Sequence, residues 1–234
     1  MHENQHNVFV TGGTGYLGRP LIAALLQRGH AVRALVREGS HGKLPPGCQP
    51  VLGNALDASS YASHIRPADT FVQLVGVAHP SPAKAAQFRS IDLVSAAGAI
   101  QAAIVAGIKH FVYLSVAQPA PMMKAYVAVR AECEAIILRS RLNATMLRPW
   151  YVLGPGHRWP YALLPMYWLM EQLPFTRDGA RRLGLVTLEQ MKCALVHTVE
   201  NPCQGVRVVE VPQIRAPAAS FQAASQISAE PQAS

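Results

Sequence analysis

Residues 8–20, VFVTGGTGYLGRP, decide the fold that we expect for this chain. Apolar and β-branched residues lead into Gly12, and glycines recur at Gly15 and Gly18 before a helix-forming segment. Glycines at this spacing allow a tight turn, a close approach of the backbone to a pyrophosphate, and close packing of helix on strand. The N–H groups at the start of the helix would bind the phosphates. The alternative is a glycine-rich turn without a ligand, and the flanking strand and helix favour the dinucleotide site.

Strands and helices alternate outward from this stretch. Apolar runs predict further strands at residues 30–37, 48–56, 69–77, 109–116, 144–152 and 206–212. Helical patterns fall between them at residues 16–28, 61–65, 83–106 and 124–140, and another helix follows Thr187 as its N-cap. Strands that are apolar throughout are typical of a parallel sheet covered on both faces. We therefore expect an α/β fold, a Rossmann-type doubly wound parallel sheet with a small C-terminal lobe.

The length of 234 residues suits one domain. We expect a single dinucleotide-binding domain at residues 1–215, with a Pro-rich, aromatic substrate lobe at about 155–185. Residues 216–234 are mostly Ala, Ser, Gln and Pro, which predicts a disordered tail.

Composition limits the possible partners. The net charge is +8, but the basic residues are scattered and no nucleic-acid-binding motif is present, so we expect no nucleic acid. The apolar runs are interrupted by glycine and too short for a membrane span. The four cysteines show no metal-ligand spacing, which favours free thiols and no metal. We expect a cytoplasmic protein, a monomer or homodimer, that binds a small-molecule substrate.

The end of the second predicted strand indicates which dinucleotide is bound. An acidic residue there would hold the ribose 2′-OH of NAD, but this chain has Arg37, with Lys43 in the following loop. A guanidinium suits a 2′-phosphate, so we favour NADP, with NAD possible. The alternative is a solvated surface arginine. Asp57, after the third strand, would contact the adenine or cap the following turn.

A candidate chemical site follows the fifth predicted strand. Ser115 ends that strand, and Tyr126 and Arg130 share one face of the next helix at i, i+4 spacing. A tyrosine beside a cation has a stabilised phenolate and can donate a proton to a carbonyl oxygen, which a serine can orient. The alternative is structural: a turn serine, a packed tyrosine, and an ion pair between Arg130 and Glu134.

The chain resembles the atypical, NmrA-like and epimerase-like members of the short-chain dehydrogenase/reductase superfamily. The resemblance rests on TGGTGYLG, VRALVR, GIKHFVYLSV, the Tyr126-x3-Arg130 helix and LRPWYVLGPG, and covers roughly residues 7–156. It implies a Rossmann fold, a bound NAD(P), and a Ser–Tyr–Lys site at Ser115, Tyr126 and Arg130. Arg130 stands where the family has lysine; it keeps the charge but does not carry a proton.

Position in this fold suggests the remaining contacts of the cofactor. The ligand crevice lies at the carboxyl ends of the strands. The expected contacts are Thr14, Tyr16 and Leu17 in the glycine stretch, Gly76, Val77 and Ala78 after the fourth strand, and Pro149, Trp150 and Tyr151 after the sixth. Asp92, inside an apolar helix, is expected to anchor a neighbouring strand end by a hydrogen bond.

These observations favour an NADP(H)-dependent oxidoreductase acting on a small, largely apolar carbonyl or enone. A second hypothesis is a dinucleotide-binding redox sensor or assembly factor without turnover. A third is a nucleotide-sugar epimerase or dehydratase, for which the C-terminal lobe is short.

Overall fold

A computed structural model describes residues 5–120, 122–155, 183–216 and 226–227. Among them, seven parallel strands form the central sheet in the order β9-β6-β5-β4-β1-β2-β3, and the short strand β10 pairs antiparallel with β9. The parallel strands are β1 Asn7–Thr11, β2 Ala31–Val36, β3 Gln49–Leu52, β4 Thr70–Gln73, β5 His110–Leu114, β6 Ala144–Arg148 and β9 Val206–Glu210; β10 is Gln226–Ile227. The predicted α/β Rossmann fold is confirmed.

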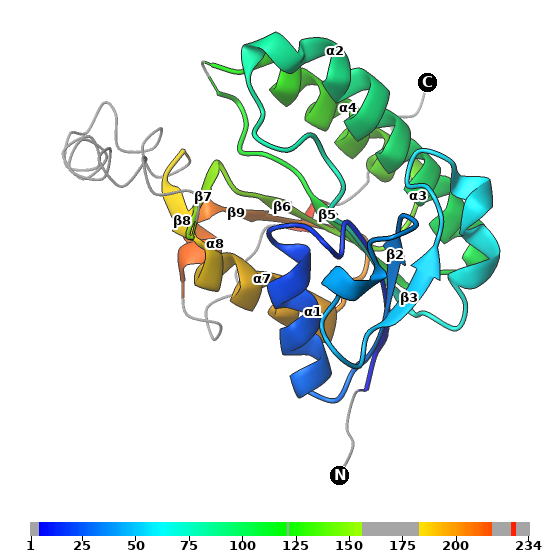
Figure 1. Ribbon diagram of the computed structural model, residues 1–234. Coiled ribbons are helices and arrows are strands. Elements are labelled where there is room, and N and C mark those ends of the chain that lie inside the picture. The colour runs from blue at the N-terminus through cyan, green and yellow to red at the C-terminus, as the bar shows by residue number, and fades with distance from the viewer. Residues whose placement is uncertain (1–4, 121, 156–182, 217–225, 228–234) are drawn as a thin grey trace.

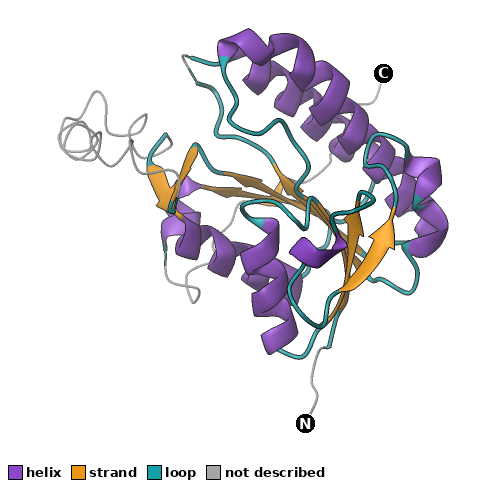
Figure 2. Ribbon diagram, in the orientation of Figure 1, coloured by secondary structure: helices purple, strands orange, loops and turns teal. Residues whose placement is uncertain are grey.

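Helices cover both faces of this sheet (Figures 1 and 2). On one face lie α1 Gly18–Gln27, α7 Leu188–Glu200 and α8 Val211–Arg215; on the other lie α2 Ala85–Gln87, α3 Val94–Ala106 and α4 Lys124–Ser140. Short 3₁₀ turns are η1 His41–Lys43, η2 Ala58–Ser60, η3 Ala62–His64 and η4 Pro82–Lys84. Each face buries its own apolar cluster, which is why the strands are apolar on both sides.

The strand order reverses between β1 and β4, so the chain winds outward in both directions from this point. Ligands of open α/β sheets bind beyond the carboxyl ends of the strands at such a switch point. We call this side of the sheet the carboxyl edge and the opposite side the amino edge. The carboxyl edge is therefore where the site is sought.

The helical run Pro82–Ala106 is long and apolar enough to span a membrane by length and composition alone, among the described residues. Within the protein, 44% of its most apolar window is buried. It is also not one regular helix, because Phe88–Leu93, labelled η5, forms a π-helical turn between α2 and α3. Such turns are frequent at functional sites.

Strand β7 Tyr151–Leu153 pairs with β8 Leu185–Thr187 in a small second sheet. Thr187 then caps α7: its hydroxyl accepts from the Gln190 N–H, and the Gln190 side chain accepts from the Thr187 N–H. The predicted N-cap is confirmed. Most of the predicted substrate lobe, residues 156–182, and most of the predicted disordered tail lie outside the described residues.

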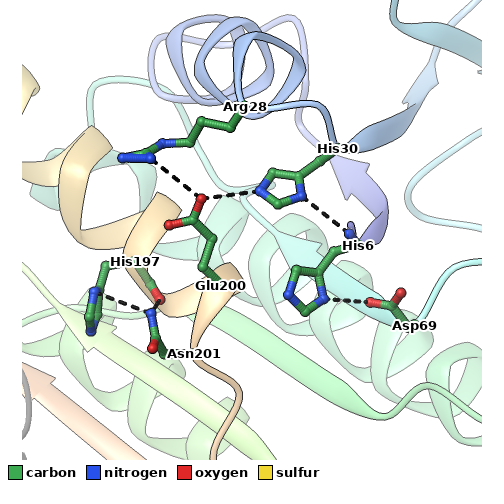
Figure 3. Close-up of polar contacts among 7 residues, drawn as sticks. All are labelled: His6, Arg28, His30, Asp69, His197, Glu200 and Asn201. Carbon is green, nitrogen blue, oxygen red and sulfur yellow. Dashed lines mark hydrogen bonds and ion pairs between the residues drawn. The ribbon is translucent and has the colours of Figure 1, made fainter. Parts of the chain in front are cut away.

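Polar side chains hold the amino edge together (Figure 3). His30 Nδ1 accepts from the His6 backbone N–H at 3.2 Å, and His30 Nε2 lies 3.2 Å from Glu200 Oε1 at the end of α7. Asp69 Oδ2 accepts from the Asn7 N–H at 2.9 Å, and Asp69 Oδ1 lies 3.4 Å from His6 Nδ1. These contacts fix the start of the central strand β1.

Candidate functional site

A cavity of about 490 Å³ lies at the carboxyl edge over the switch point. It is lined by the glycine loop after β1, the ends of β2 and β3, the segment 74–78 after β4, and one side of the helical run that begins at η4. The described lining residues are Gly12, Thr14, Gly15, Leu35, Val36, Arg37, Ser40, Gly53, Asn54, Ala55, Leu56, Leu74, Val75, Gly76, Val77, Ala78, Lys84, Gln87 and Ile91. The structure thus brings together seven of the residues predicted to bind the cofactor.

The glycine loop has the backbone geometry of a phosphate cradle. Gly12 has a φ of +74°, and a Cβ there would lie 3.0 Å from the Leu74 carbonyl carbon across the switch point. A Cβ at Gly18 would overlap the Gly12 carbonyl oxygen, so the start of α1 packs directly on the loop. Glycine is therefore required for the turn and for helix packing, as the spacing predicts.

The start of α1 points an uncapped helix end at this loop. No side chain caps it, and its first turn contains no acidic residue. The first N–H groups of a helix have no partner within the helix, and the helix dipole favours an anion there. A glycine cradle followed by an uncapped helix fits the pyrophosphate of a dinucleotide.

The cavity is lined by two cations and no carboxylate among its described residues. Arg37 follows β2 and is exposed, which leaves its guanidinium accessible to a ligand. The half-buried Lys84 lies on the other side of the cavity, where its Nζ donates to the carbonyls of Ala78 at 2.6 Å and His79 at 3.1 Å. This lining suits an anionic ligand.

Other residues predicted to bind the cofactor lie elsewhere. Lys43 and Tyr16 line a neighbouring cleft of about 600 Å³, on the α1 side of the glycine loop, rather than the main cavity. Leu17 and Trp150 pack against the apolar cluster under α1 and α7. Asp57 is the N-cap of η2, where its carboxylate accepts from the Ser59 N–H at 3.1 Å.

The residues after β6 begin the small sheet. The Pro149 carbonyl accepts from the Ala117 N–H at 2.9 Å, and Tyr151 is the first residue of β7. Among the described residues, neither these two nor the predicted chemical triad line the main cavity. Of the triad, Arg130 lies directly behind Gly76, where an added Cβ would overlap its Nη2.

The hydroxyl of Ser115 is bonded within the protein. Its Oγ donates to Glu134 Oε1 at 2.5 Å, and Gln118 donates to Glu134 Oε2 at 2.7 Å. Arg148 forms a two-pronged ion pair with the same carboxylate and also bonds Glu210 at 2.9 Å. Glu134 therefore pairs with an arginine of β6, and not with Arg130 on its own helix.

Arg130 is buried, and its partner is Asp92 in the π-helical turn, 2.7 Å away. Its Nη1 also donates to the Leu114 carbonyl at 2.8 Å and the Tyr113 hydroxyl at 3.1 Å. Burial opposes the charge, but the neighbouring Tyr126, Tyr113 and Asp92 together raise the pKa of Arg130. Burial raises the pKa of Asp92, and the Arg130 guanidinium acts against that rise. The site thus holds a fixed buried charge pair.

Tyr126 is half-buried on α4, beside this pair. The Arg130 guanidinium carbon lies 5.1 Å from the centroid of the Tyr126 ring, and the Phe88 ring lies at 5.0 Å. The guanidinium therefore packs over the Tyr126 ring as a cation–π contact. Among the described residues, there is no group of three or more His, Cys, Asp or Glu that could hold a metal.

Several cavity residues were not predicted from the sequence. Ser40, Asn54, Lys84 and Gln87 offer polar groups to a ligand, yet none belongs to the glycine motif. Asn54 was the most accessible to prediction, because it follows the third parallel strand at the carboxyl edge. The place of Lys84 depends on the path of the loop after β4, which the sequence does not specify.

Comparison with known proteins identifies a family for this chain. Residues 12–158 match the NAD(P)H-binding family. The chain is 29% identical to a 3-diazoavenalumate denitrifying reductase of a Streptomyces species over 85% of this chain and 73% of that protein. It is 25% identical to a ceramide reductase of Caulobacter vibrioides over 89% of this chain and 65% of that protein. A ketoreductase of Stigmatella aurantiaca, named for a farnesyl dihydroquinoline-1-oxide, is 28% identical over 62% of this chain and 50% of that protein.

Solved structures share the fold. WbmH of Bordetella bronchiseptica, in complex with NAD+, has a TM-score of 0.66 and 20% identity, covering 88% of this chain and 76% of that chain. MoeE5, in complex with UDP-glucose and NAD, has a TM-score of 0.65 and 20% identity, covering 93% and 82%. The resemblance to atypical short-chain dehydrogenases/reductases is confirmed, and the chain is an NAD(P)-binding protein.

Proposed function

We propose that this chain, which belongs to the NAD(P)H-binding family, is an NADP(H)-dependent oxidoreductase of a small, largely apolar carbonyl or enone. The observation that carries the proposal is the cavity at the glycine loop, lined by Arg37 and Lys84 with no carboxylate among its described residues. Three of the similar proteins are named as reductases or ketoreductases, and this chain spans between half and three quarters of their length.

NADP is favoured over NAD by the residue at the end of β2. NAD sites place a carboxylate there to accept from the ribose 2′-OH, whereas a guanidinium cannot accept a hydrogen bond. Arg37 instead offers paired N–H donors to a 2′-phosphate. Ser40, one turn further along the same wall, adds a hydroxyl donor.

The bound nicotinamide would supply the hydride. Tyr126 would donate the proton to the carbonyl oxygen, and the nearby Arg130 cation would stabilise the phenolate that remains. The hydroxyl proton of Ser115 is committed to Glu134, so Ser115 would offer a substrate only its lone pairs. Ser115 would then accept from the hydroxyl of an alcohol product and hold it in place.

Cofactor preference is tested by titrating NADPH and NADH into wild type and Arg37→Ala, following nicotinamide fluorescence. We expect Arg37→Ala to weaken NADPH binding by about 1.5–3 kcal/mol, the scale of a charge-assisted hydrogen bond, and to leave NADH binding unchanged. Lys109→Ala removes a charge from the opposite, amino edge and is the matched control. An absence of binding by both nucleotides would refute the proposal.

Turnover is tested with a panel of small ketones and enones and NADPH. We expect oxidation of NADPH by wild type and its loss in Tyr126→Phe, which keeps the ring and removes the acid. Equal rates in the two proteins would remove Tyr126 from the chemistry.

A dinucleotide-binding sensor or assembly factor is the second candidate. The bonding of Ser115 and Arg130 favours this function. The Ser115 hydroxyl donates to Glu134, and the Arg130 guanidinium is paired with Asp92, so both groups are already engaged within the protein. This function predicts tight NADPH binding without turnover on any substrate. It also predicts a protein partner that is recovered only when the nucleotide is bound.

A further inference from the structure

The Arg130–Asp92 ion pair lies directly behind the wall of the dinucleotide cavity. Arg130 comes from α4 and is 4% exposed, and Asp92 comes from the π-helical turn and is fully buried. Their side chains meet at 2.7 Å between Arg130 Nη2 and Asp92 Oδ1. The π-helical turn, which lines the cavity through Ile91, is therefore joined to α4 by a buried ion pair.

The second oxygen of Asp92 holds the cavity wall itself. Asp92 Oδ2 accepts from the backbone N–H of Val77 at 3.0 Å, and Val77 lines the cavity. The expected role of Asp92 as an anchor for a strand end is confirmed, because Val77 follows β4. A partly buried peptide N–H beyond the end of β4, without a regular strand partner, is stabilised by such an acceptor.

The guanidinium holds the same wall from behind. A Cβ at Gly76 would overlap Arg130 Nη2, so only glycine lets the wall pass this close. Nη1 of Arg130 donates to the Leu114 carbonyl at the end of β5 and to the Tyr113 hydroxyl. One planar side chain thus connects the wall after β4, the end of β5 and the π-helical turn. A lysine has a single nitrogen and cannot reach the same acceptors in this fork geometry.

We infer that Arg130 and Asp92 form a positioning pair that sets the 76–78 wall for dinucleotide binding, and that Arg130 acts through this wall rather than as a ribose ligand. The inference rests on the proposed function only in taking the ligand as a dinucleotide. Arg130, which stands where the family has lysine, would then position the 76–78 wall instead of binding the ribose. Lysine should therefore be a poor replacement for Arg130.

The test compares Arg130→Lys, Asp92→Asn and the double variant with wild type. We expect each single variant to weaken NADPH and NADH binding about tenfold or more, since the wall loses a shared support. The double variant should be no weaker than the worse single variant, because both substitutions break one contact. Arg130→Lys with wild-type affinity and equal or faster turnover would overturn the inference and make Arg130 a stand-in for lysine.

Arg89→Lys is the matched control. Arg89 and Glu132 form an exposed ion pair at 3.1 Å between the same π-helical turn and α4. The same Arg-to-Lys change alters an exposed link between these elements without touching the wall, so NADPH affinity should stay within about twofold of wild type. If Arg89→Lys weakened NADPH binding as much as Arg130→Lys does, the effect would come from the packing of α4 on the π-helical turn, and the inference would be overturned.

Hydrogen exchange gives a readout that needs no ligand. The Val77 amide should exchange at least tenfold faster in Asp92→Ala, which leaves no side-chain acceptor, than in wild type, while the amides of β4 stay protected. Unchanged exchange at Val77 overturns the inference, whether or not the wild-type protein binds a nucleotide. A wild-type protein that binds no nucleotide would refute the proposed function separately.

Gly76→Ala carries the binding test if Arg130→Lys does not fold, because the added Cβ would displace the Arg130 guanidinium. A tenfold loss of nucleotide affinity in Gly76→Ala supports the positioning pair, and unchanged affinity overturns the inference.

Discussion

The two edges of the sheet hold polar groups of different kinds. At the carboxyl edge, buried charges are matched in pairs, Arg130 with Asp92 and Arg148 with Glu134. At the amino edge the buried groups include histidines, and burial lowers the pKa of His110 to about 3, so it stays neutral. The carboxyl edge thus holds paired charges, whereas the amino edge holds His110, a neutral buried group whose protonation would disrupt that edge.

The largest predicted effect breaks a pair at the carboxyl edge. Arg148→Met leaves the Glu134 carboxylate, 5% exposed, without its cation. Removing one partner of a buried pair costs about 3–5 kcal/mol, so the free energy of unfolding in urea should fall by about that amount. Glu189→Gln removes the exposed pair with Lys192 and should leave unfolding almost unchanged. Equal midpoints for the two variants would show that the pair is not a source of stability.

The second predicted effect is a loss of stability at low pH, caused by His110 at the amino edge. His110 has a pKa of 6.5 when unfolded and about 3 when folded, so the folded state binds fewer protons. The contribution of neutral His110 to the free energy of unfolding is therefore fully present above pH 6.5. It is lost progressively as the pH falls from 6.5 toward 3. Between pH 7 and pH 5 the loss is about 2 kcal/mol, at about 1.4 kcal/mol per pH unit.

Urea unfolding at pH 7, 6 and 5 measures this effect. His110→Asn removes the titrating group, so its stability should fall less with pH than that of wild type. NADPH affinity at pH 7 should match wild type, because the substitution lies at the edge opposite the cavity. Parallel pH profiles for the two proteins would contradict the assignment.

A smaller predicted effect concerns Lys84 at the carboxyl edge and its contribution to nucleotide binding. Lys84→Met removes the cation held by the Ala78 and His79 carbonyls and should weaken NADPH and NADH equally, by about 1.5 kcal/mol. The loss should shrink at high salt, since salt screens a partly exposed charge. Lys192→Met, on the exposed side of α7, is the control. A loss confined to NADPH would place Lys84 at the 2′-phosphate instead.

The smallest effect concerns a cap that belongs to neither edge's chemistry. Thr187→Ala removes the capping box of α7 and should lower the free energy of unfolding by about 1 kcal/mol. Thr187→Ser keeps the hydroxyl and should restore most of it. Nucleotide affinity should be unchanged in both variants. Weaker NADPH binding in Thr187→Ala would mean that α7 helps to shape the cavity.

Local sequence patterns specified much of this fold. The glycine spacing predicted the cradle, because the φ of Gly12 and the contact at Gly18 admit no side chain. The apolar runs predicted all seven parallel strands, since burial on both faces leaves few polar positions. The helix predicted at 124–140 is α4, and the Thr187 cap is present. These features depend on residues close together in the chain.

Partners distant in the chain were not predictable in the same way. Helical spacing offered Glu134 as an ion-pair partner of Arg130, but the partner is Asp92, on another element. Lys43 was grouped with Arg37, yet the two line different clefts, because the turn η1 carries Lys43 to the α1 side of the glycine loop. Which charges meet depends on how helices pack, and periodicity reports only which face of a helix is apolar.

The contact between His30 and Glu200 spans 170 positions of the chain. During synthesis, the central strand β1 leaves the ribosome before its neighbour β4, and Glu200 follows long after both. The contacts that hold the start of β1 can therefore be completed only after α7, which ends at Glu200, has been translated. Until then the start of β1 depends on Asp69 and on pairing with β2 and β4.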